Sequence, residues 1–157
     1  MEYRFASTED VPLLARMNRE LTEDEGHRNR FQPQAWFEER MRVFLAGSYR
    51  AVIFERDGQA VAYALYTDQT EHADTIYLRQ IFVGRFCRRQ GVGREAIRIL
   101  AENIWPRERR ITVGVLFGNQ AAIDFYRAIG FAPYSIEMEM AALSDRGQAG
   151  AQLLGKE

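Results

Sequence analysis

The sequence predicts a mixed α/β (α+β) domain in which a mostly antiparallel central sheet is flanked by helices. Short apolar or alternating runs of strand length are separated by longer segments with apolar residues at helical spacing. Asp57-Gly58, a typical hairpin turn, stands between two such strand runs. Residues 79–100 run from a strand through a basic, glycine-containing turn into a helix. The predicted order is β-α-α-β-β-β-α-β-α-β.

Length and composition limit the classes of protein to consider. The 157 residues, 46% of them hydrophobic, suffice for one sizeable core but not for two ordinary domains. We expect a single domain over residues 1–141 and a tail over 142–157. A net charge of −1 argues against a nucleic-acid partner, and no run approaches ~18 apolar residues. We therefore expect a cytoplasmic protein without a membrane partner.

Residues typical of helix starts and of turns locate the helices and strands in the first half of the chain. Ser7, with Asp10 three residues later, predicts a helix start, and Pro33 is suited to the first turn of a second helix. Strands on either side of the Asp57-Gly58 turn pair antiparallel. The predicted elements are a strand at 3–6, helices from residue 7 to near 26 and from 33 to 47, and strands at 49–55 and 60–66.

The second half alternates strands and helices. A strand ends at Val83, and the helix that follows the basic turn is closed by Pro106. Residues 111–115 predict a further strand, and residues 119–131 a further helix. Residues 131–140 predict a final strand, since Ile136, Met138 and Met140 alternate with glutamates.

The turn at residues 88–93 has the composition of an anion-binding site. The first turn of a helix leaves backbone N–H groups without partners and carries the positive end of the helix dipole. Gly91 and Gly93 have no Cβ, so a phosphate can approach the main chain, and Arg88 and Arg89 add positive charge. A Walker loop and a dinucleotide fingerprint both fit these residues poorly.

Two motifs identify a family. Arg88-x-x-Gly91-x-Gly93 resembles the acyl-CoA signature of the GNAT superfamily of N-acyltransferases, Gln/Arg-x-x-Gly-x-Gly/Ala. Residues 119–131 resemble the motif that follows it in this superfamily. On a helix, Asn119 and Tyr126 fall on one face and can address one bound molecule. The structural alternative makes Asn119 a helix N-cap and Tyr126 a core aromatic.

The resemblance implies the GNAT fold, an acetyl-CoA co-substrate and no metal. The single cysteine, Cys87, also excludes a cysteine-based zinc site of the usual spacing. By the same resemblance, Tyr126 is the general acid that protonates the departing CoA thiolate. The residues expected to bind acetyl-CoA are Ile81, Phe82, Val83, Arg88, Arg89, Gln90, Gly91, Val92, Gly93, Arg94 and Asn119.

The general base and the acceptor are less well defined. Some family members use a glutamate on the strand before the CoA turn, where this chain has Gln80. Members that acetylate protein N-termini place one five residues before the motif asparagine, where this chain has Gly114. The missing carboxylates argue against a protein-N-terminus acetylator of that type and leave a water relay or an acid from the first half of the chain. On the acceptor side, Asp24, Glu25 and His27 can attract an amine or accept a proton.

The leading hypothesis is N-acetylation of a small cationic amine, such as an amino sugar, a polyamine or an amino-acid derivative. The alternatives are acetylation of a protein lysine and a regulatory acyl-CoA-binding module without catalysis. A homodimer is possible.

Overall fold

The computed structural model describes residues 1–142 and divides into two compact units, Met1–Phe125 and a second that begins at Tyr126. The predicted fold class is confirmed, because helices flank a five-stranded mixed sheet. The elements are β1 (Glu2–Phe5), η1 (Thr8–Asp10), α1 (Val11–Asp24), α2 (Gln34–Ala46), β2 (Arg50–Arg56), β3 (Gln59–Thr67), β4 (Thr75–Val83), η2 (Arg85–Cys87), α3 (Val92–Ile99), η3 (Leu100–Ile104), β5 (Arg110–Val113) and α4 (Gln120–Ala128).

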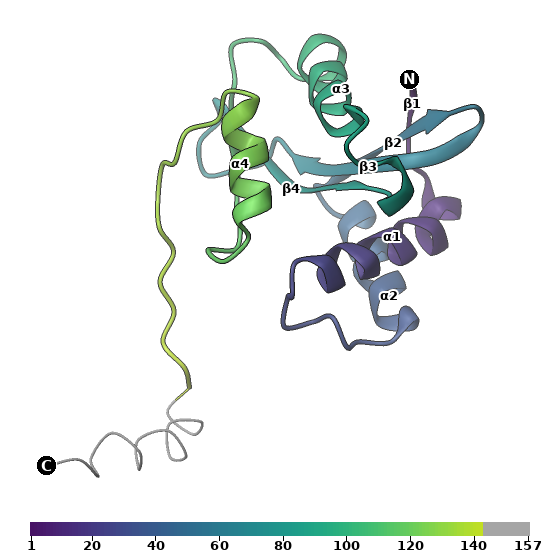
Figure 1. The fold of residues 1–157 in the computed structure, drawn as a ribbon, viewed down its shortest axis with the longest axis horizontal. Helices are drawn as coiled ribbons and strands as arrows, with labels where there is room; N and C mark the ends of the chain where they lie inside the picture. The colour runs from purple at the N-terminus through teal and green to yellow at the C-terminus, as the bar shows by residue number, and fades with distance from the viewer. Residues whose placement is uncertain (143–157) are drawn as a thin grey trace, which may run out of the picture. The chain divides into compact units, whose positions relative to one another are not determined.

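The strands follow the order β1-β2-β3-β4-β5 across the sheet. The pairs from β1 to β4 are antiparallel, and β5 is parallel to β4. Parallel neighbours need a crossover connection, which α3 supplies here. In the first unit, α1 and α2 lie on one face of the sheet and α3 lies on the other (Figure 1).

Local signals fix most element ends where the sequence predicts them. The Ser7 side chain accepts from the backbone N–H of Glu9, and the Asp10 carboxylate accepts from that of Ser7 at 2.8 Å. This capping box starts the short η1 turn that leads into α1. The prediction for Pro33 is one residue off, since Pro33 is the N-cap of α2.

The hairpin between β2 and β3 is confirmed. Asp57 (φ 50°) and Gly58 (φ 73°) both have left-handed backbones, as a two-residue hairpin turn of this hand requires. Arg56 pairs with Gln59 directly across the turn. The turn therefore sets the register of the pairs next to it, up to Glu55 with Ala60, and a β-bulge then shifts the register so that Phe54 pairs with Ala62.

A β-bulge interrupts β4. Leu65 of β3 pairs with Gln80, but the next residue, Tyr66, pairs with Leu78, so Arg79 is left without a partner on β3. Gln80 receives a hydrogen bond from Tyr63 of the core on the α1/α2 face. Arg79 contacts aromatic rings on that same face. The extra residue therefore turns two consecutive side chains to one face of the sheet.

The main core lies between the sheet and helices α1 and α2. Its fully buried side chains include Leu14 of α1, Phe37 and Met41 of α2, and Tyr63 of β3. Each large apolar side chain buried in this way stabilises the fold by about 1.5–3 kcal/mol. This packing holds the sheet against both helices.

The predicted final strand is wrong. Residues 131–140 have no regular structure, and Ile136, Met138 and Met140 are 74%, 85% and 76% exposed. Alternation alone does not make a strand, because the backbone groups of a strand need a neighbouring strand to pair with. The expected tail at 142–157 lies outside the described residues except for Ala142.

Candidate active site

One edge of β4 is open beside the basic turn. β5 pairs with β4 only from Thr75 to Leu78, whereas β3 follows β4 as far as Val83. Within residues 1–142, the other edge of residues 79–83 therefore carries no strand. Phe82 is 2% exposed and belongs to the core, so its main chain rather than its side chain is available to a ligand. An extended ligand can add to such an edge by main-chain hydrogen bonds.

The structure explains why glycine stands at both position 91 and position 93 of the turn. Gly91 is the N-cap of α3 and has a left-handed backbone, with φ 77°. No atom lies within 4 Å of the place where its Cβ would stand, so the turn is open there. At Gly93, a Cβ would lie 3.1 Å from the Phe125 ring. Gly91 therefore shapes the helix start, and Gly93 lets α3 approach Phe125 closely.

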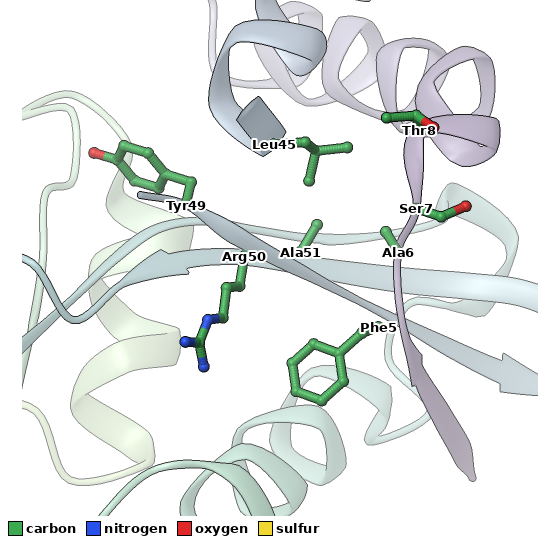
Figure 2. Close-up of a pocket in the computed structure, with 8 residues that line it drawn as sticks. All are labelled: Phe5, Ala6, Ser7, Thr8, Leu45, Tyr49, Arg50 and Ala51. Carbon is green, nitrogen blue, oxygen red and sulfur yellow. The ribbon is translucent and has the colours of Figure 1, made fainter. Parts of the chain in front are cut away.

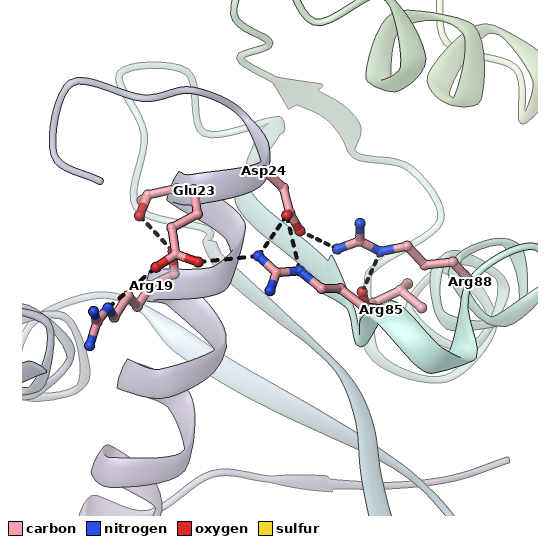
Figure 3. Close-up of polar contacts among 7 residues, drawn as sticks. Arg19, Glu23, Asp24, Arg85 and Arg88 are labelled. Atoms are coloured by element: carbon pink, nitrogen blue, oxygen red, sulfur yellow. Dashed lines mark hydrogen bonds and ion pairs between the residues drawn. The ribbon is translucent and has the colours of Figure 1, made fainter. Parts of the chain in front are cut away.

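Arg88 connects the turn to the open edge and to α1. Its Nε atom donates to the backbone carbonyl of Val83 at 3.0 Å, and its Nη2 atom donates to Asp24. Figure 3 shows Asp24 between the guanidinium groups of Arg88 and Arg85. The structure therefore brings Asp24, a predicted acceptor-side residue, together with the predicted CoA turn.

The charge of Asp24 is largely matched by these arginines. Burial alone would raise the pKa of Asp24, but hydrogen bonds from Arg88 and Arg85 outweigh this effect and lower that pKa. Arg85 also pairs with Glu23 at 3.2 Å. Of the two predicted acceptor-side acids, Asp24 is thus the one that pairs with the arginines of the turn region.

The remaining turn residues have different environments. The Gln90 side-chain amide donates to the Phe86 carbonyl at 3.0 Å and so braces the turn. Arg89 has a left-handed backbone with φ 61°, and the side chains of Arg89 and Arg94 are exposed. Val92 is buried, so its main chain is the part that can meet a ligand.

Glu25 and His27 follow α1 and differ in their electrostatic surroundings. Burial raises the pKa of Glu25, and the neighbouring charge of Asp24 adds to the increase. Burial also lowers the pKa of His27, helped by Arg40, Arg28 and Arg79, so the imidazole is neutral at pH 7. Its Nδ1 atom accepts from a backbone N–H at 3.1 Å. His27 therefore carries its proton on Nε2 while Nδ1 is occupied, so Glu25 is the side chain of the two that can accept a proton.

Gln80 occupies the strand position where some family members carry a glutamate. Its Oε1 atom accepts a hydrogen bond from the Tyr63 hydroxyl at 3.0 Å, and both side chains are buried. Burial raises the pKa of Tyr63 far above its usual value, so this phenol stays protonated. The pair is a neutral polar contact between β3 and β4 in the buried interior.

Sequence reasoning missed two arginines on this side of the sheet. Arg40 lies on α2, and Arg79 is the bulge residue of β4. Both guanidinium groups lie close to the Phe44 ring. The signal on α2 was Trp36, Arg40 and Phe44 at intervals of four residues, which places an arginine within an aromatic stripe.

Asn119 and Tyr126 have the structural roles that were the alternative in the sequence analysis. The Asn119 Oδ1 atom accepts from the Ala122 backbone N–H at 3.2 Å, as an N-cap does. In the second unit, Tyr126 is 8% exposed, and its ring packs edge-on against Phe131 at 5.3 Å. Their roles toward a ligand stay predictions.

A cavity of about 320 Å³ lies where β1 ends and β2 begins (Figure 2). Figure 2 shows Arg50 and Ala51 leaving β2 on opposite sides, so the space surrounds the end of a strand. No residue predicted to bind acetyl-CoA or the acceptor lines this cavity. Its lining residues are Phe5, Ala6, Ser7, Thr8, Leu45, Tyr49, Arg50 and Ala51.

Residues 1–142 show neither a metal-binding cluster nor a membrane-spanning helix. These residues contain no group of three or more His, Cys, Asp or Glu side chains arranged to hold a metal ion. None of their helices combines the length and the apolar character that crossing a membrane requires.

The sheet is mixed, and β4 has an unpaired edge beside the glycine turn that starts α3. This arrangement defines the acyltransferase class of fold. The model of the Acetyltransferase (GNAT) family matches residues 14–131, and the chain belongs to this family. The predicted family is thus confirmed. A comparison with curated protein sequences gave no match.

Solved structures share the fold at low sequence identity. An aminoglycoside 6′-N-acetyltransferase from Acinetobacter haemolyticus is 19% identical, with a TM-score of 0.67 over 90% of this chain and 98% of that one. A second aminoglycoside N-acetyltransferase, in complex with CoA, is 15% identical, with a TM-score of 0.70 over 90% and 94%. A ribosomal-protein-alanine N-acetyltransferase from Brucella melitensis is 22% identical, with a TM-score of 0.65 over 86% of each chain.

Proposed function

We propose that this protein is an N-acetyltransferase that moves the acetyl group of acetyl-CoA to a primary amine of a small, cationic molecule. The observation that carries the proposal is the continuity between the open edge of β4 and the glycine turn. Arg88 of the turn reaches back to the carbonyl of Val83, the last residue of that edge. One extended ligand with an anionic end fits such a surface.

The described residues suit the separate parts of acetyl-CoA. The main chain of Ile81, Phe82 and Val83 would hold the pantetheine arm along the open edge. The backbone N–H groups at the start of α3 would hold the pyrophosphate, where the open turn at Gly91 leaves room. Arg88 and Arg89 would add positive charge, and Asn119 would bind the pantetheine.

The reaction needs one proton removed and one supplied. Acetyl-CoA supplies an activated acetyl group as a thioester. The neutral amine nitrogen forms a bond to the acetyl carbon, and the bond from that carbon to sulfur breaks. Glu25 takes the surplus proton from nitrogen, either directly or through water, and Tyr126 gives its phenolic proton to the thiolate. A phenol with a pKa near ~10 is a reasonable donor to a thiolate.

Solved relatives support a small-molecule acceptor. Two of the structures with this fold are aminoglycoside N-acetyltransferases, whose named acceptors are small amines. The ribosomal-protein-alanine N-acetyltransferase shows that the fold also serves protein acceptors. Acetylated protein without turnover of any free amine would favour the protein-lysine alternative.

Calorimetric titration with acetyl-CoA tests the proposed cofactor site. We expect the wild type to bind and Gly91→Glu to lose binding, because the substitution places a carboxylate in the phosphate turn. Gly58→Glu is a matched control, since Gly58 also has a left-handed backbone with no atom within 4 Å of its Cβ position. Equal binding by wild type and Gly91→Glu, or no binding by wild type at millimolar ligand, would overturn the proposal.

A further inference from the structure

Two arginines and three aromatic rings form a cluster on the α1/α2 face of the sheet. The arginine–aromatic cluster consists of Arg40, Arg79, Trp36, Phe44 and Tyr49. The Arg40 Cζ atom lies 5.2 Å from the ring centroids of both Trp36 and Phe44. The Arg79 Cζ atom lies 4.9 Å from the Phe44 centroid and 5.6 Å from that of Tyr49. The two guanidinium groups therefore share the Phe44 ring.

The positive charge of this cluster is not neutralised within residues 1–142. The Nε atoms of Arg40 and Arg79 are buried and have no hydrogen-bond partner there. Arg79 makes one long contact, from Nη1 to the Tyr49 hydroxyl at 3.4 Å. By contrast, Arg42, two residues further along α2, pairs with two glutamates at 3.3 Å.

Holding two like charges close together has an electrostatic cost. Burial lowers the pKa of the Arg40 guanidinium, and the charge of Arg79 lowers it further. Both side chains are only partly buried, so part of each stays accessible to solvent. An anion between them would relieve the repulsion and accept forked hydrogen bonds from the planar guanidinium groups.

The cluster lies at the end of the proposed pantetheine track. With the pyrophosphate at the start of α3, the pantetheine runs back along β4 from Val83 to Ile81. A strand advances ~3.3 Å per residue, so the Cα of Arg79 lies ~7 Å beyond Ile81. His27, a predicted acceptor-side residue, lies within electrostatic range of both arginines. The acyl group and the arginine pair thus lie toward the same end of the edge.

We infer that the acceptor carries a carboxylate close to its amine, and that Arg40 and Arg79 bind this carboxylate. The acceptor is then an amino acid or an amino-acid derivative, in which the ammonium group supplies the positive charge of the proposed acceptor. Polycations such as polyamines and aminoglycosides, which have no carboxylate, are poor acceptors. The inference rests on the proposed function and narrows its substrate class. Glu25 meets the amine, and the arginine pair meets the carboxylate.

Matched acceptors test the inference. The full chain is assayed for CoA thiol release with acetyl-CoA and a panel of amino acids, each beside its amino-acid amide, which has the same amine but no negative charge. We expect the best amino acid to exceed its amide in kcat/KM by about 10- to 100-fold, as two charge-assisted hydrogen bonds would give. O-phosphoethanolamine separates a preference for carboxylate from a preference for any anion.

Variants assign the preference to the two arginines. Arg79→Gln and Arg40→Gln are expected to raise the KM of the amino acid about 10-fold or more while leaving that of its amide within about 2-fold. Arg42→Gln, on the same helix, is the control and should keep the preference. Arg79→Lys keeps the charge, loses the fork and should show an intermediate value. An unchanged acetyl-CoA affinity shows that each variant is folded.

Three results would overturn the inference, and each is distinguishable from failure of the proposed function. The first is equal or better turnover of the amides, the second is better turnover of O-phosphoethanolamine than of any amino acid, and the third is an unchanged preference in both variants. All three require acetyl transfer to an amine, which supports the proposed function. If acetyl-CoA binds but no amine is acetylated, calorimetry compares the binding of glycine with that of glycinamide. Equal binding of the two would overturn the inference.

Discussion

The Nε atom of Arg88 donates a hydrogen bond to the backbone carbonyl of Val83 at 3.0 Å. Through this contact the first arginine of the turn reaches the last residue of the open strand. The Arg88 side chain is therefore held by a backbone carbonyl as well as by its salt bridge to Asp24. Both contacts keep its guanidinium group beside the glycine turn.

Removing the charge of Arg88 should weaken binding of acetyl-CoA. We expect Arg88→Gln to raise the dissociation constant about 10-fold, the effect of losing one charge-assisted contact to phosphate. Arg85→Gln is the control, because Arg85 shares Asp24 but lies outside the motif, and it should stay within about 2-fold. Equal losses in both variants, measured by calorimetry, would instead assign the effect to Asp24.

Tyr126→Phe should slow turnover by roughly 10- to 1000-fold while leaving acetyl-CoA affinity nearly unchanged. The substitution removes the proton donor and keeps the ring that packs against Phe131. Steady-state kinetics beside calorimetry separates the two effects. A variant with full turnover would remove Tyr126 from the mechanism.

Glu25→Gln should lower kcat/KM for the amine by about 100-fold as a lost general base. In the wild type, activity should fall as pH drops through the raised pKa of Glu25, above its ordinary 4.5, and the variant should lack this acidic limb. A carboxyl whose pKa is raised on folding destabilises the fold above that pKa.

The same Glu25→Gln substitution should therefore raise the melting temperature at pH 7 by about 1–3 °C. Lower activity together with lower stability would point to a damaged fold rather than a lost base.

Asp10→Asn should destabilise the protein by about 1–2 kcal/mol at pH 7, which is about 2–8 °C in melting temperature. Asp10 accepts hydrogen bonds from Arg4 at 2.8 and 2.9 Å and from the Ser7 N–H. The Arg4 hydrogen bonds lower the pKa of Asp10 despite partial burial. This stabilisation is present above the ordinary pKa of 3.8 and is lost as pH falls through the lowered value.

Thermal unfolding of the Asp10→Asn variant from pH 7 down to about pH 3 tests this, because the gap to wild type should close with acid. Glu9→Gln, in the same turn, should change little, since Glu9 is exposed. A gap that stays constant with pH would show that the carboxylate charge is not the cause.

Local chemistry made most of the fold predictable. The cap at Ser7 and the turn at Asp57-Gly58 depend on neighbours within three residues, and both form where the sequence places them. The motif Arg88-x-x-Gly91-x-Gly93 likewise specifies a turn whose geometry is local.

Features that depend on distant partners were not predictable. The alternation at residues 131–140 carries no information about a neighbouring strand, so the predicted strand was wrong. Arg40 and Arg79 are separated by almost forty positions, and only the packing of α2 on the sheet brings both to the Phe44 ring. The salt bridge between Asp24 and Arg88 is a further contact of this kind.

A residue in a regular strand both pairs with its neighbour and presents its side chain, whereas the bulge residue Arg79 presents its side chain without pairing on β3. Since Arg79 has no counterpart on β3, its side chain is not part of the cross-strand pairing that fixes the sheet. Core positions such as Phe82 must stay apolar, whereas position 79 can vary in charge and size without shifting the register. A single substitution at position 79 can therefore change the charge that this face of the sheet presents while the strand pairing stays the same.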